Sequence, residues 1–261
     1  MFRPKDREKC LHLSEKYYSG GKFHDALYRE LIQEYLPSGG CLLDAGCGRY
    51  LKSSKEFAST AEAVGIDLES TLETANKCSP FGVRGDLNHL PFPSGYFDSV
   101  ISRYVVEHLE KPAQVFREFY RVLSTGGNVI LATPNKYDYV SLIAMITPHS
   151  WHRALVSHVF KVSEDDVYPT LYRANTLSKI GKELRSAGLS EKDLQTINRY
   201  PAYLMISPLL FRLAVLYERL TSQDMFPSLR SVILCVFEKE TVQNPALSSN
   251  REGPKFTPVP I

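Results

Sequence analysis

Cysteine and tryptophan are scarce in this chain of 261 residues. It contains one tryptophan and five cysteines. The number of cysteines is odd, and no two of them form a Cys-X-X-Cys pair. Disulfide frameworks and zinc knuckles are built from closely spaced sets of cysteines. The cysteine pattern therefore excludes the small disulfide-rich secreted class, and we expect a cytoplasmic protein in a reducing environment.

The chain also lacks an excess of one charge and a long apolar run. Its 31 basic and 29 acidic residues leave a formal net charge of +2, which provides no broad field for steering nucleic acid. Residues 1–9 lack the apolar stretch of a signal sequence. The apolar window 202–217 contains Pro208 and Arg212, and it is shorter than the roughly 20 residues that a spanning helix needs. We therefore expect neither a nucleic-acid partner nor a membrane span, while peripheral membrane contact stays open.

What the chain does contain is an alternation of short apolar runs with helical patterns. At 43% hydrophobic residues it can bury a full core, and its length favours one large domain. The pattern predicts strands at 41–44, 63–67, 82–85, 96–103, 128–133, 193–200 and 231–238. Helices are predicted at 24–36, 51–58, 113–123, 203–220 and, between a Thr176 cap and Gly188, at 177–187. Such alternation predicts an α/β fold with a parallel sheet.

Three segments follow from this pattern. Residues 1–40 are expected to be a helical segment, residues 41–240 the main domain, and residues 241–261 a flexible tail of prolines among small and polar residues. Inside the domain, residues 135–175 are rich in aromatic residues and histidines and interrupt the alternation. We interpret them as an insertion.

Two glycines follow the first predicted strand. Gly46 and Gly48 lack a Cβ atom, so they can adopt positive φ and let backbone amides approach a ligand closely. The next strand ends in Asp67, 23 residues beyond Asp44, where a carboxylate can accept hydrogen bonds from both ribose hydroxyls of an adenosine. Two other interpretations compete: a tight packing turn with Asp67 as a helix cap, and a dinucleotide site, which needs a third glycine where Leu51 stands. The combined features favour an adenosine site.

The segment Leu42–Gly48 resembles motif I of class I S-adenosylmethionine-dependent methyltransferases. Later stretches resemble the signatures of the type 11 small-molecule methyltransferases, namely Gly85–Leu87, Leu90–Pro93, Tyr96–Asp98, Val106–Leu109 and Arg121–Leu123 with Gly126 and Gly127. The resemblance covers Leu42–Pro134. It implies a Rossmann-like α/β fold whose seven-stranded sheet is mostly parallel with one antiparallel strand, with helices on both faces and a helical substrate cap at 135–175.

The resemblance implies S-adenosylmethionine as cofactor and S-adenosylhomocysteine as product. Gly46 and nearby backbone would hold the methionine part, Asp67 the ribose, and Asp86 with Leu87 the adenine. A turn role is the alternative for Asp86, and core packing is the alternative for an aromatic contact from Tyr17. The expected cofactor-binding set is Tyr17, Asp44, Ala45, Gly46, Cys47, Gly48, Asp67, Leu68, Asp86, Leu87, Ser102 and Arg103.

The loop departs from the family pattern at Arg49 and Tyr50, where a small residue is usual. Arg49 could reach the cofactor carboxylate or an anionic substrate, or it could lie on the surface. Methyl transfer depends mainly on positioning, and an acceptor hydroxyl also benefits from a base. The candidate bases are His108, whose alternative role is structural, and His149 and His152 of the insertion. The histidine spacings match no standard ligand set, so we expect no metal.

Two apolar stretches bear on the identity of the acceptor. Apolar stretches at 139–146 and 203–216 could line a pocket, rest on a membrane or pack against the sheet. We expect O- or N-methylation of a small molecule, with a hydrophobic, lipid-linked or glycan metabolite as a hypothesis, and the oligomeric state stays open. The alternatives are an inactive cofactor-binding partner module and a methyltransferase for a macromolecule, which the balanced charge disfavours.

Overall fold

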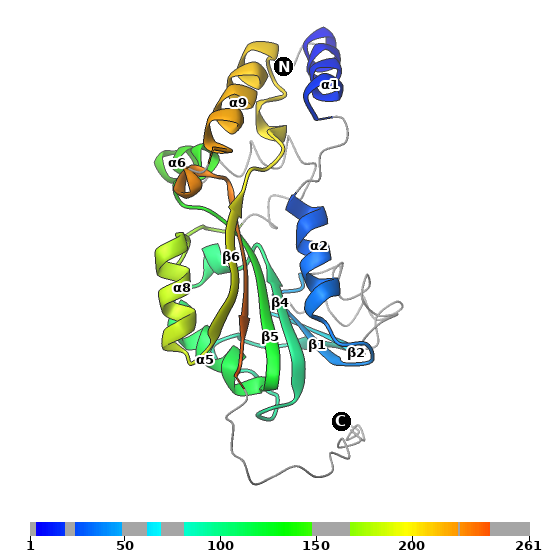
Figure 1. The fold of residues 1–261 in the computed structure, drawn as a ribbon, viewed down its shortest axis with the longest axis vertical. Coiled ribbons are helices and arrows are strands. Elements are labelled where there is room, and N and C mark those ends of the chain that lie inside the picture. The colour runs from blue at the N-terminus through cyan, green and yellow to red at the C-terminus, as the bar shows by residue number, and fades with distance from the viewer. Residues whose placement is uncertain are drawn as a thin grey trace.

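A computed structural model describes residues 4–18, 24–48, 62–68, 81–147, 168–223 and 225–240. In these ranges seven strands form one sheet in the order β3-β2-β1-β4-β5-β7-β6 (Figure 1). The strands are β1 (Cys41–Ala45), β2 (Glu62–Asp67), β3 (Phe81–Arg84), β4 (Phe97–Arg103), β5 (Leu123–Pro134), β6 (Ser190–Ile197) and β7 (Val232–Glu238). β7 pairs antiparallel with β5 and β6, and the other strand pairs are parallel. The expected Rossmann-like, mostly parallel sheet is confirmed.

Helices cover both faces of this sheet. The α-helices in the described ranges are α1 (Pro4–Tyr18), α2 (His24–Tyr35), α5 (Pro112–Val122), α6 (Tyr139–Ile146), α8 (Leu177–Ser186) and α9 (Pro208–Thr221). Short 3-10 turns lie at η1 (Val106–His108), η3 (Ala202–Leu204) and η4 (Pro227–Leu229). Neighbouring residues of a strand point to opposite faces, so Leu43 packs in the cluster formed with α5 and α8, whereas Leu42 packs in the cluster formed with α2.

Several predicted boundaries move for identifiable reasons. The helix expected from residue 203 begins at Pro208, because a proline is tolerated in the first turn and holds the preceding residue extended. The strand expected at 193–200 lies at Ser190–Ile197. It is an edge strand with little burial. Its first residues are therefore polar and show none of the alternation of apolar and polar residues from which strands are predicted. The Thr176 side chain accepts a hydrogen bond from the Lys179 amide, which confirms the predicted cap of α8.

A group of helices lies beyond the carboxyl ends of the parallel strands. Helix α6 follows the end of β5, and α9 follows the end of β6. Helix α1 packs on α9, although nearly 200 residues separate them, through a buried cluster of Cys10, Leu13, Phe211 and Val215. Figure 1 shows these helices stacked above the sheet. Open α/β sheets bind ligands at this edge, so these helices adjoin the expected ligand crevice.

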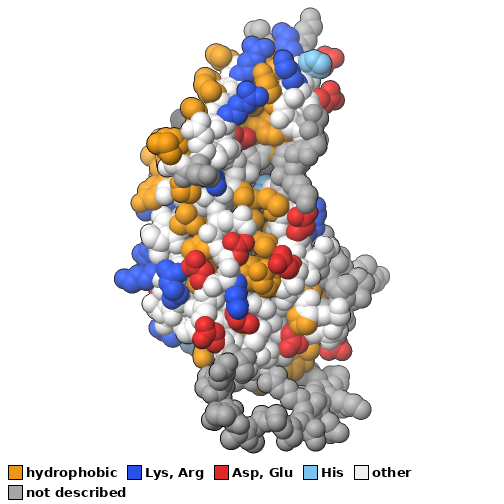
Figure 2. Space-filling model, in the orientation of Figure 1, with side chains coloured by type: hydrophobic (Ala, Val, Ile, Leu, Met, Phe, Trp, Pro, Cys, Tyr) orange, Lys and Arg blue, Asp and Glu red, His pale blue; other side chains and the backbone are white. Residues whose placement is uncertain are grey.

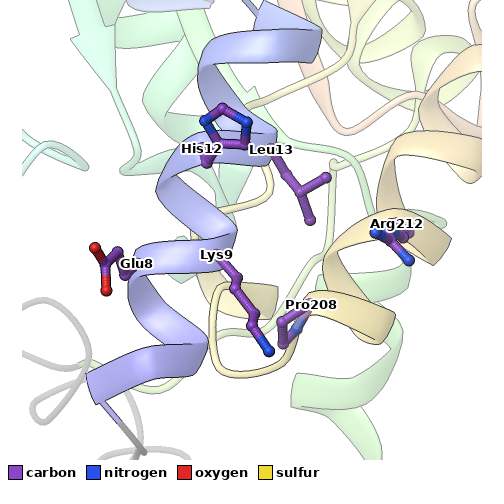
Figure 3. Close-up of a pocket in the computed structure, with 6 residues that line it drawn as sticks. All are labelled: Glu8, Lys9, His12, Leu13, Pro208 and Arg212. Carbon is purple, nitrogen blue, oxygen red and sulfur yellow. The ribbon is translucent and has the colours of Figure 1, made fainter.

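The surface of this group carries apolar side chains, which Figure 2 shows over α6 and α9 with Lys and Arg side chains nearby. A pocket of about 460 Å³ lies between α1 and α9, lined by Glu8, Lys9, His12, Leu13, Pro208 and Arg212 (Figure 3). Within the described ranges, every helix is too short or too polar to cross a bilayer. The predicted helix at 51–58 and tail at 241–261, and residues 148–167 of the insertion, lie outside the described residues.

Candidate functional site

The glycine loop after β1 is tied to the end of β2. The amide of Gly46 donates to the Ile66 carbonyl at 2.8 Å, and the amide of Cys47 donates to the same oxygen at 3.3 Å. Gly46 has φ +79°, and an added Cβ would overlap Cγ2 of Val105 and lie 3.0 Å from its Cγ1. Glycine is therefore required at position 46 for two reasons: the backbone has a positive φ, and there is no space for a Cβ atom.

Asp67, at the end of β2, contacts Gly48 of the glycine loop, which lies 19 residues earlier in the sequence. Its Oδ2 accepts a hydrogen bond from the Gly48 amide at 2.9 Å. The carboxylate at the end of β2 thus holds the loop that follows β1. A carboxylate can accept about four hydrogen bonds, so one that organises the loop can also serve ribose hydroxyls. The geometry fits the predicted adenosine site.

The remaining predicted residues of β1 and β4 support this edge. Ser102 donates its hydroxyl to the Ala45 carbonyl at 2.7 Å, which holds the end of β1 against β4. Asp44 is 3% exposed, whereas Leu68 is 66% exposed. Arg103 pairs with Asp25 of α2 at 3.4 Å. The structure therefore brings Asp44, Ala45 and Ser102 together behind the loop, and it directs Arg103 toward α2.

Cys47 lies in the loop as a neutral thiol. Burial raises its pKa above the ordinary value, and the carboxylates of Asp44 and Asp67 raise it further. A thiol reacts as a thiolate, so this environment disfavours covalent chemistry at Cys47. The hydrogen bond from its backbone amide to the Ile66 carbonyl holds Cys47 in the loop.

Asp86 and Leu87 follow β3, as expected. Asp86 Oδ1 accepts hydrogen bonds from the Asn88 amide at 2.9 Å and the Asn88 side chain at 2.8 Å. Leu87 is buried in the core cluster below the loop. These contacts match the turn role of Asp86, and its contact with adenine stays a prediction.

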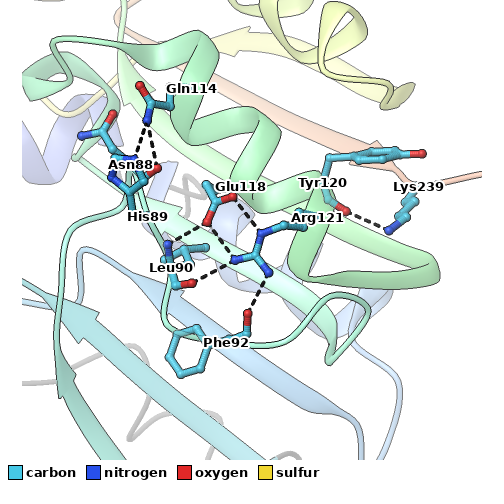
Figure 4. A network of polar contacts seen from close by, with 9 residues as sticks. All are labelled: Asn88, His89, Leu90, Phe92, Gln114, Glu118, Tyr120, Arg121 and Lys239. Atoms are coloured by element: carbon cyan, nitrogen blue, oxygen red, sulfur yellow. Dashed lines mark hydrogen bonds and ion pairs between the residues drawn. The ribbon is translucent and has the colours of Figure 1, made fainter.

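Helix α5 holds the loop after β3 in place (Figure 4). The Arg121 guanidinium donates to the carbonyls of Phe92 at 2.7 Å and Leu90 at 2.9 Å, and it pairs with Glu118. Glu118 in turn accepts from the Leu90 amide at 2.7 Å. Hydrogen bonding to Arg121 lowers the pKa of Glu118. The motif that begins with Arg121 therefore positions the loop that is expected to hold adenine, a role that the sequence did not indicate.

Tyr17 lies on the contact between α1 and α9. Its ring centre is 5.1 Å from the Arg219 guanidinium and 5.7 Å from the Lys16 ammonium, and it packs against the buried α1–α9 cluster. These contacts match the core-packing alternative. Contact with the cofactor stays a prediction.

His108 contacts the last part of the insertion. Its Nδ1 lies 2.7 Å from the Pro169 carbonyl, which can only accept, so Nδ1 carries the proton. The neighbouring Glu107 carbonyl accepts from the amides of Leu171 at 2.6 Å and Tyr172 at 3.1 Å. These contacts match the structural alternative for His108, and its role as a base stays a prediction. His149, His152, Arg49 and Tyr50 lie outside the described residues.

No local sequence pattern indicated a polar cluster that lies at the carboxyl edge around the buried Asp138. Tyr104 follows β4, Asp138 follows β5 and Arg199 follows β6. Asp138 pairs with Arg199 at 3.2 Å and accepts from the Ser231 hydroxyl at 3.0 Å. Tyr104 has φ +59°, which is unusual for a side chain of this size. Burial raises the pKa of Asp138 despite Arg199, so desolvation exceeds the attraction of the pair.

Glu218 adds a second buried carboxylate between α1, α6 and α9. It is 7% exposed, and its Oε2 accepts a hydrogen bond from the Tyr18 hydroxyl. Neither Glu218 Oε1 nor the buried Tyr139 hydroxyl has a hydrogen-bond partner among the described residues. Burial raises the pKa of Glu218 to about 7, whereas the Tyr18 hydrogen bond opposes this shift. Glu218 therefore titrates near neutral pH.

This titration predicts a pH-dependent stability. The folded protein holds the Glu218 proton more tightly than the unfolded chain, whose ordinary value is 4.5, so wild-type stability falls between about pH 4.5 and pH 7. A glutamine at this position would not titrate and would still accept from Tyr18. We expect Glu218→Gln to gain stability relative to wild type over this range, by up to about 3 kcal/mol. Urea unfolding at several pH values measures the gain, with the exposed Glu15→Gln as control. Equal pH profiles of Glu218→Gln and wild type would contradict the assignment.

The described ranges contain no group of three His, Cys, Asp or Glu side chains that could hold a metal. What they do contain is a glycine loop and a strand-end carboxylate at the ligand edge of a seven-stranded sheet with one antiparallel strand. Fold and site together define a Rossmann-like domain of the methyltransferase type.

Comparison with known proteins agrees with this type of domain. Residues 43–131 match the family model described as "Methyltransferase domain". A probable S-adenosylmethionine-dependent methyltransferase of Mycolicibacterium smegmatis is 31% identical over 119 residues, covering 44% of this chain and 46% of that protein. Over residues 43–131 the chain is thus similar to S-adenosylmethionine-dependent methyltransferases, and this similarity supports S-adenosylmethionine as the cofactor. It spans about half the length of the curated relatives it matches.

Solved structures share the fold. An S-adenosylmethionine-dependent methyltransferase from Mesorhizobium loti superposes with a TM-score of 0.54 at 18% identity, covering 80% of this chain and 96% of that one. Phosphoethanolamine N-methyltransferase 2 of Haemonchus contortus, in complex with S-adenosyl-L-methionine, superposes with a TM-score of 0.51 at 17% identity, covering 87% and 56% of the two chains. At these identities the likeness concerns the fold.

Proposed function

We propose that this protein transfers the methyl group of S-adenosylmethionine to an oxygen or nitrogen atom of a small-molecule acceptor. The observation that carries the proposal is the hydrogen bond from the Gly48 amide to Asp67. It couples the loop after β1 to the carboxylate at the end of β2 at the ligand edge of the sheet. The match of residues 43–131 to the methyltransferase family model supports the same activity.

The chain's own residues have distinct tasks in this proposal. Gly46 and nearby backbone would hold the methionine part, and Asp67 would accept from the ribose. The loop after β3, which Arg121 holds against α5, would border the adenine. When bound, the cofactor supplies a methyl group on a sulfonium that needs no further activation. The protein therefore contributes mainly by holding the acceptor in line and excluding water.

The acceptor would bind at the same edge, beside the polar cluster of Tyr104, Asp138 and Arg199. A buried carboxylate beside a partly exposed hydroxyl and guanidinium can orient a hydroxyl or amine of an acceptor. The apolar character of α6 and α9 supports a hydrophobic or lipid-linked metabolite, including a lipid-linked glycan. His108 stays a proposed base for an acceptor hydroxyl.

Substitution of Asp67 tests the cofactor site. An asparagine there would keep one acceptor for the Gly48 amide but would lose the charge and the second acceptor that two ribose hydroxyls need. We expect Asp67→Asn to weaken S-adenosylmethionine binding about 10- to 100-fold, because hydrogen bonds to a charged group contribute roughly 1.5–3 kcal/mol. Asp67→Ala should weaken binding further, because the loop also loses its anchor. Isothermal titration calorimetry measures both changes.

The matched control is Glu62→Gln, which makes the same charge change at the exposed opposite end of β2. We expect it to bind S-adenosylmethionine like the wild type. Equal affinities of Asp67→Asn and Glu62→Gln would contradict the assigned site.

Turnover separates an enzyme from an inactive binding module. The purified protein is incubated with methyl-labelled S-adenosylmethionine and a metabolite extract divided into polar and lipid fractions. A labelled small molecule that disappears in Asp67→Asn supports the proposal. Cofactor binding without any labelled product supports the inactive module, and label confined to macromolecules supports a macromolecular acceptor.

A further inference from the structure

Helix α9 has a stripe of leucines that faces solvent. Leu209, Leu213, Leu216 and Leu220 are spaced by four, three and four residues and are 66%, 53%, 53% and 50% exposed. At about 100° per residue these positions lie on one side of a helix. The buried positions of α9, including Phe211 and Glu218, lie on the opposite side. A stripe of this kind normally faces a core, yet α9 already buries its other side.

Helix α6 and the turn after α9 extend the apolar surface. Tyr139 of α6 packs edge-on against Tyr217 of α9 with ring centres 5.1 Å apart, so the two helices are neighbours. Helix α6 has no charged residue. Its exposed side chains are Leu142, Ile143, Met145 and Ile146, and Met225 after α9 is 79% exposed. We call these residues and the leucine stripe the apolar face (Figure 2).

The charges beside the apolar face have one dominant sign. Arg212 and Arg219 flank the leucine stripe on the same side, because both lie about 60–80° from Leu209 on the helix. The only carboxylate of α9, Glu218, is buried on the opposite side. Lys9 of α1 and Arg212 of α9 both line the pocket between these helices (Figure 3), where Glu8 and His12 are the other titratable lining groups. The apolar face is thus bordered mainly by cations.

We propose that the apolar face docks on an anionic lipid surface. The leucines would enter the acyl boundary, and Arg212, Arg219 and Lys9 would lie at the level of the lipid phosphates. Leucines on one side of a helix with cations at their border are the pattern of an interfacial helix. Docking goes beyond methyl transfer and does not depend on it, although it would bring the ligand edge of the sheet close to a lipid-borne acceptor.

A second copy of the chain fits this face less well. Pairing two copies would bring Arg212 and Arg219 of both into one interface, and neither α6 nor α9 offers an exposed carboxylate to pair with them. An anionic bilayer supplies the opposite charge. The charge pattern therefore favours lipid as the occupant.

Flotation of the full chain with vesicles tests the proposal without any cofactor. One vesicle is phosphatidylcholine alone, and the other contains equal parts of phosphatidylcholine and phosphatidylglycerol. We expect the wild type to float with the anionic vesicle only. Arg212→Gln/Arg219→Gln should lose about 30-fold in binding, since each cation near such a surface contributes about 1 kcal/mol. Leu213→Asn/Leu216→Asn should lose at least as much.

Control variants make changes of the same kind elsewhere on the surface. Lys179→Gln/Lys182→Gln removes two exposed cations from α8, and Leu171→Asn replaces an exposed leucine beside η1. Both should float like the wild type, and circular dichroism should show that all variants are folded. Failure of the wild type to float, or equal binding to both vesicles, would overturn the proposal. So would a concentration-dependent dimer that Leu213→Asn/Leu216→Asn abolishes while no variant binds vesicles.

Discussion

Gly46→Ala is expected to reduce the affinity for S-adenosylmethionine by about 100-fold or more. The new Cβ would overlap the Val105 side chain, and alanine at φ +79° is strained. Overpacking costs roughly 1–3 kcal/mol, and the left-handed conformation adds about 1–2 kcal/mol. The loop can relieve the overlap and the backbone strain by leaving the conformation in which its amides bond to the Ile66 carbonyl. The fraction of protein molecules that can bind the cofactor then falls. Calorimetry with S-adenosylmethionine measures the loss.

Gly39→Ala is the matched control, because it isolates the backbone cost. Gly39 has φ +74°, and an added Cβ would have nothing within 4 Å. It should lower stability slightly and leave affinity unchanged. Adding Val105→Ala to Gly46→Ala removes the overlapping methyl groups and should recover part of the affinity. If Gly46→Ala binds like Gly39→Ala, close packing against Val105 is not what shapes the loop.

Asp138→Ala is expected to lower the free energy of unfolding by about 3–5 kcal/mol, since it leaves the mostly buried Arg199 without its carboxylate. It also removes the acceptor for the Val140 amide at the start of α6 and for the Ser231 hydroxyl. One side chain thus joins β5, α6, β6 and β7 at the ligand edge. Urea unfolding measures the loss.

The control for this prediction is an exposed ion pair. Arg185 and Glu191 pair with 51% and 39% of their side chains exposed, and exposed pairs contribute at most about 1 kcal/mol. Glu191→Ala should therefore have a small effect. A loss for Asp138→Ala no larger than that of Glu191→Ala would mean that Arg199 finds water or another partner when Asp138 is removed.

The parts of the site that could be predicted are those encoded over short distances. Gly46, Gly48 and Asp67 lie at the ends of adjacent parallel strands, and the geometry of such strands brings their ends together. Helix α5 was predicted within a residue at each end, because its apolar spacing and following glycines are local signals. Helix α9 was predicted from the wrong start, because the apolar pattern continues through Tyr203 while Pro208 determines where the helix can begin.

The amino-acid sequence by itself determined the alternation of strands and helices, the glycine loop and the position of Asp67 at the end of the next strand. Each of these depends on neighbouring residues and on hydrophobic periodicity. Only the tertiary structure decided the contacts between distant segments. Asp138 meets Arg199 across 61 residues, and Tyr18 meets Glu218 across 200. No local pattern encodes such pairs, because strand order and helix packing bring them together. The same packing decides that α9 buries one side and leaves its leucine stripe exposed.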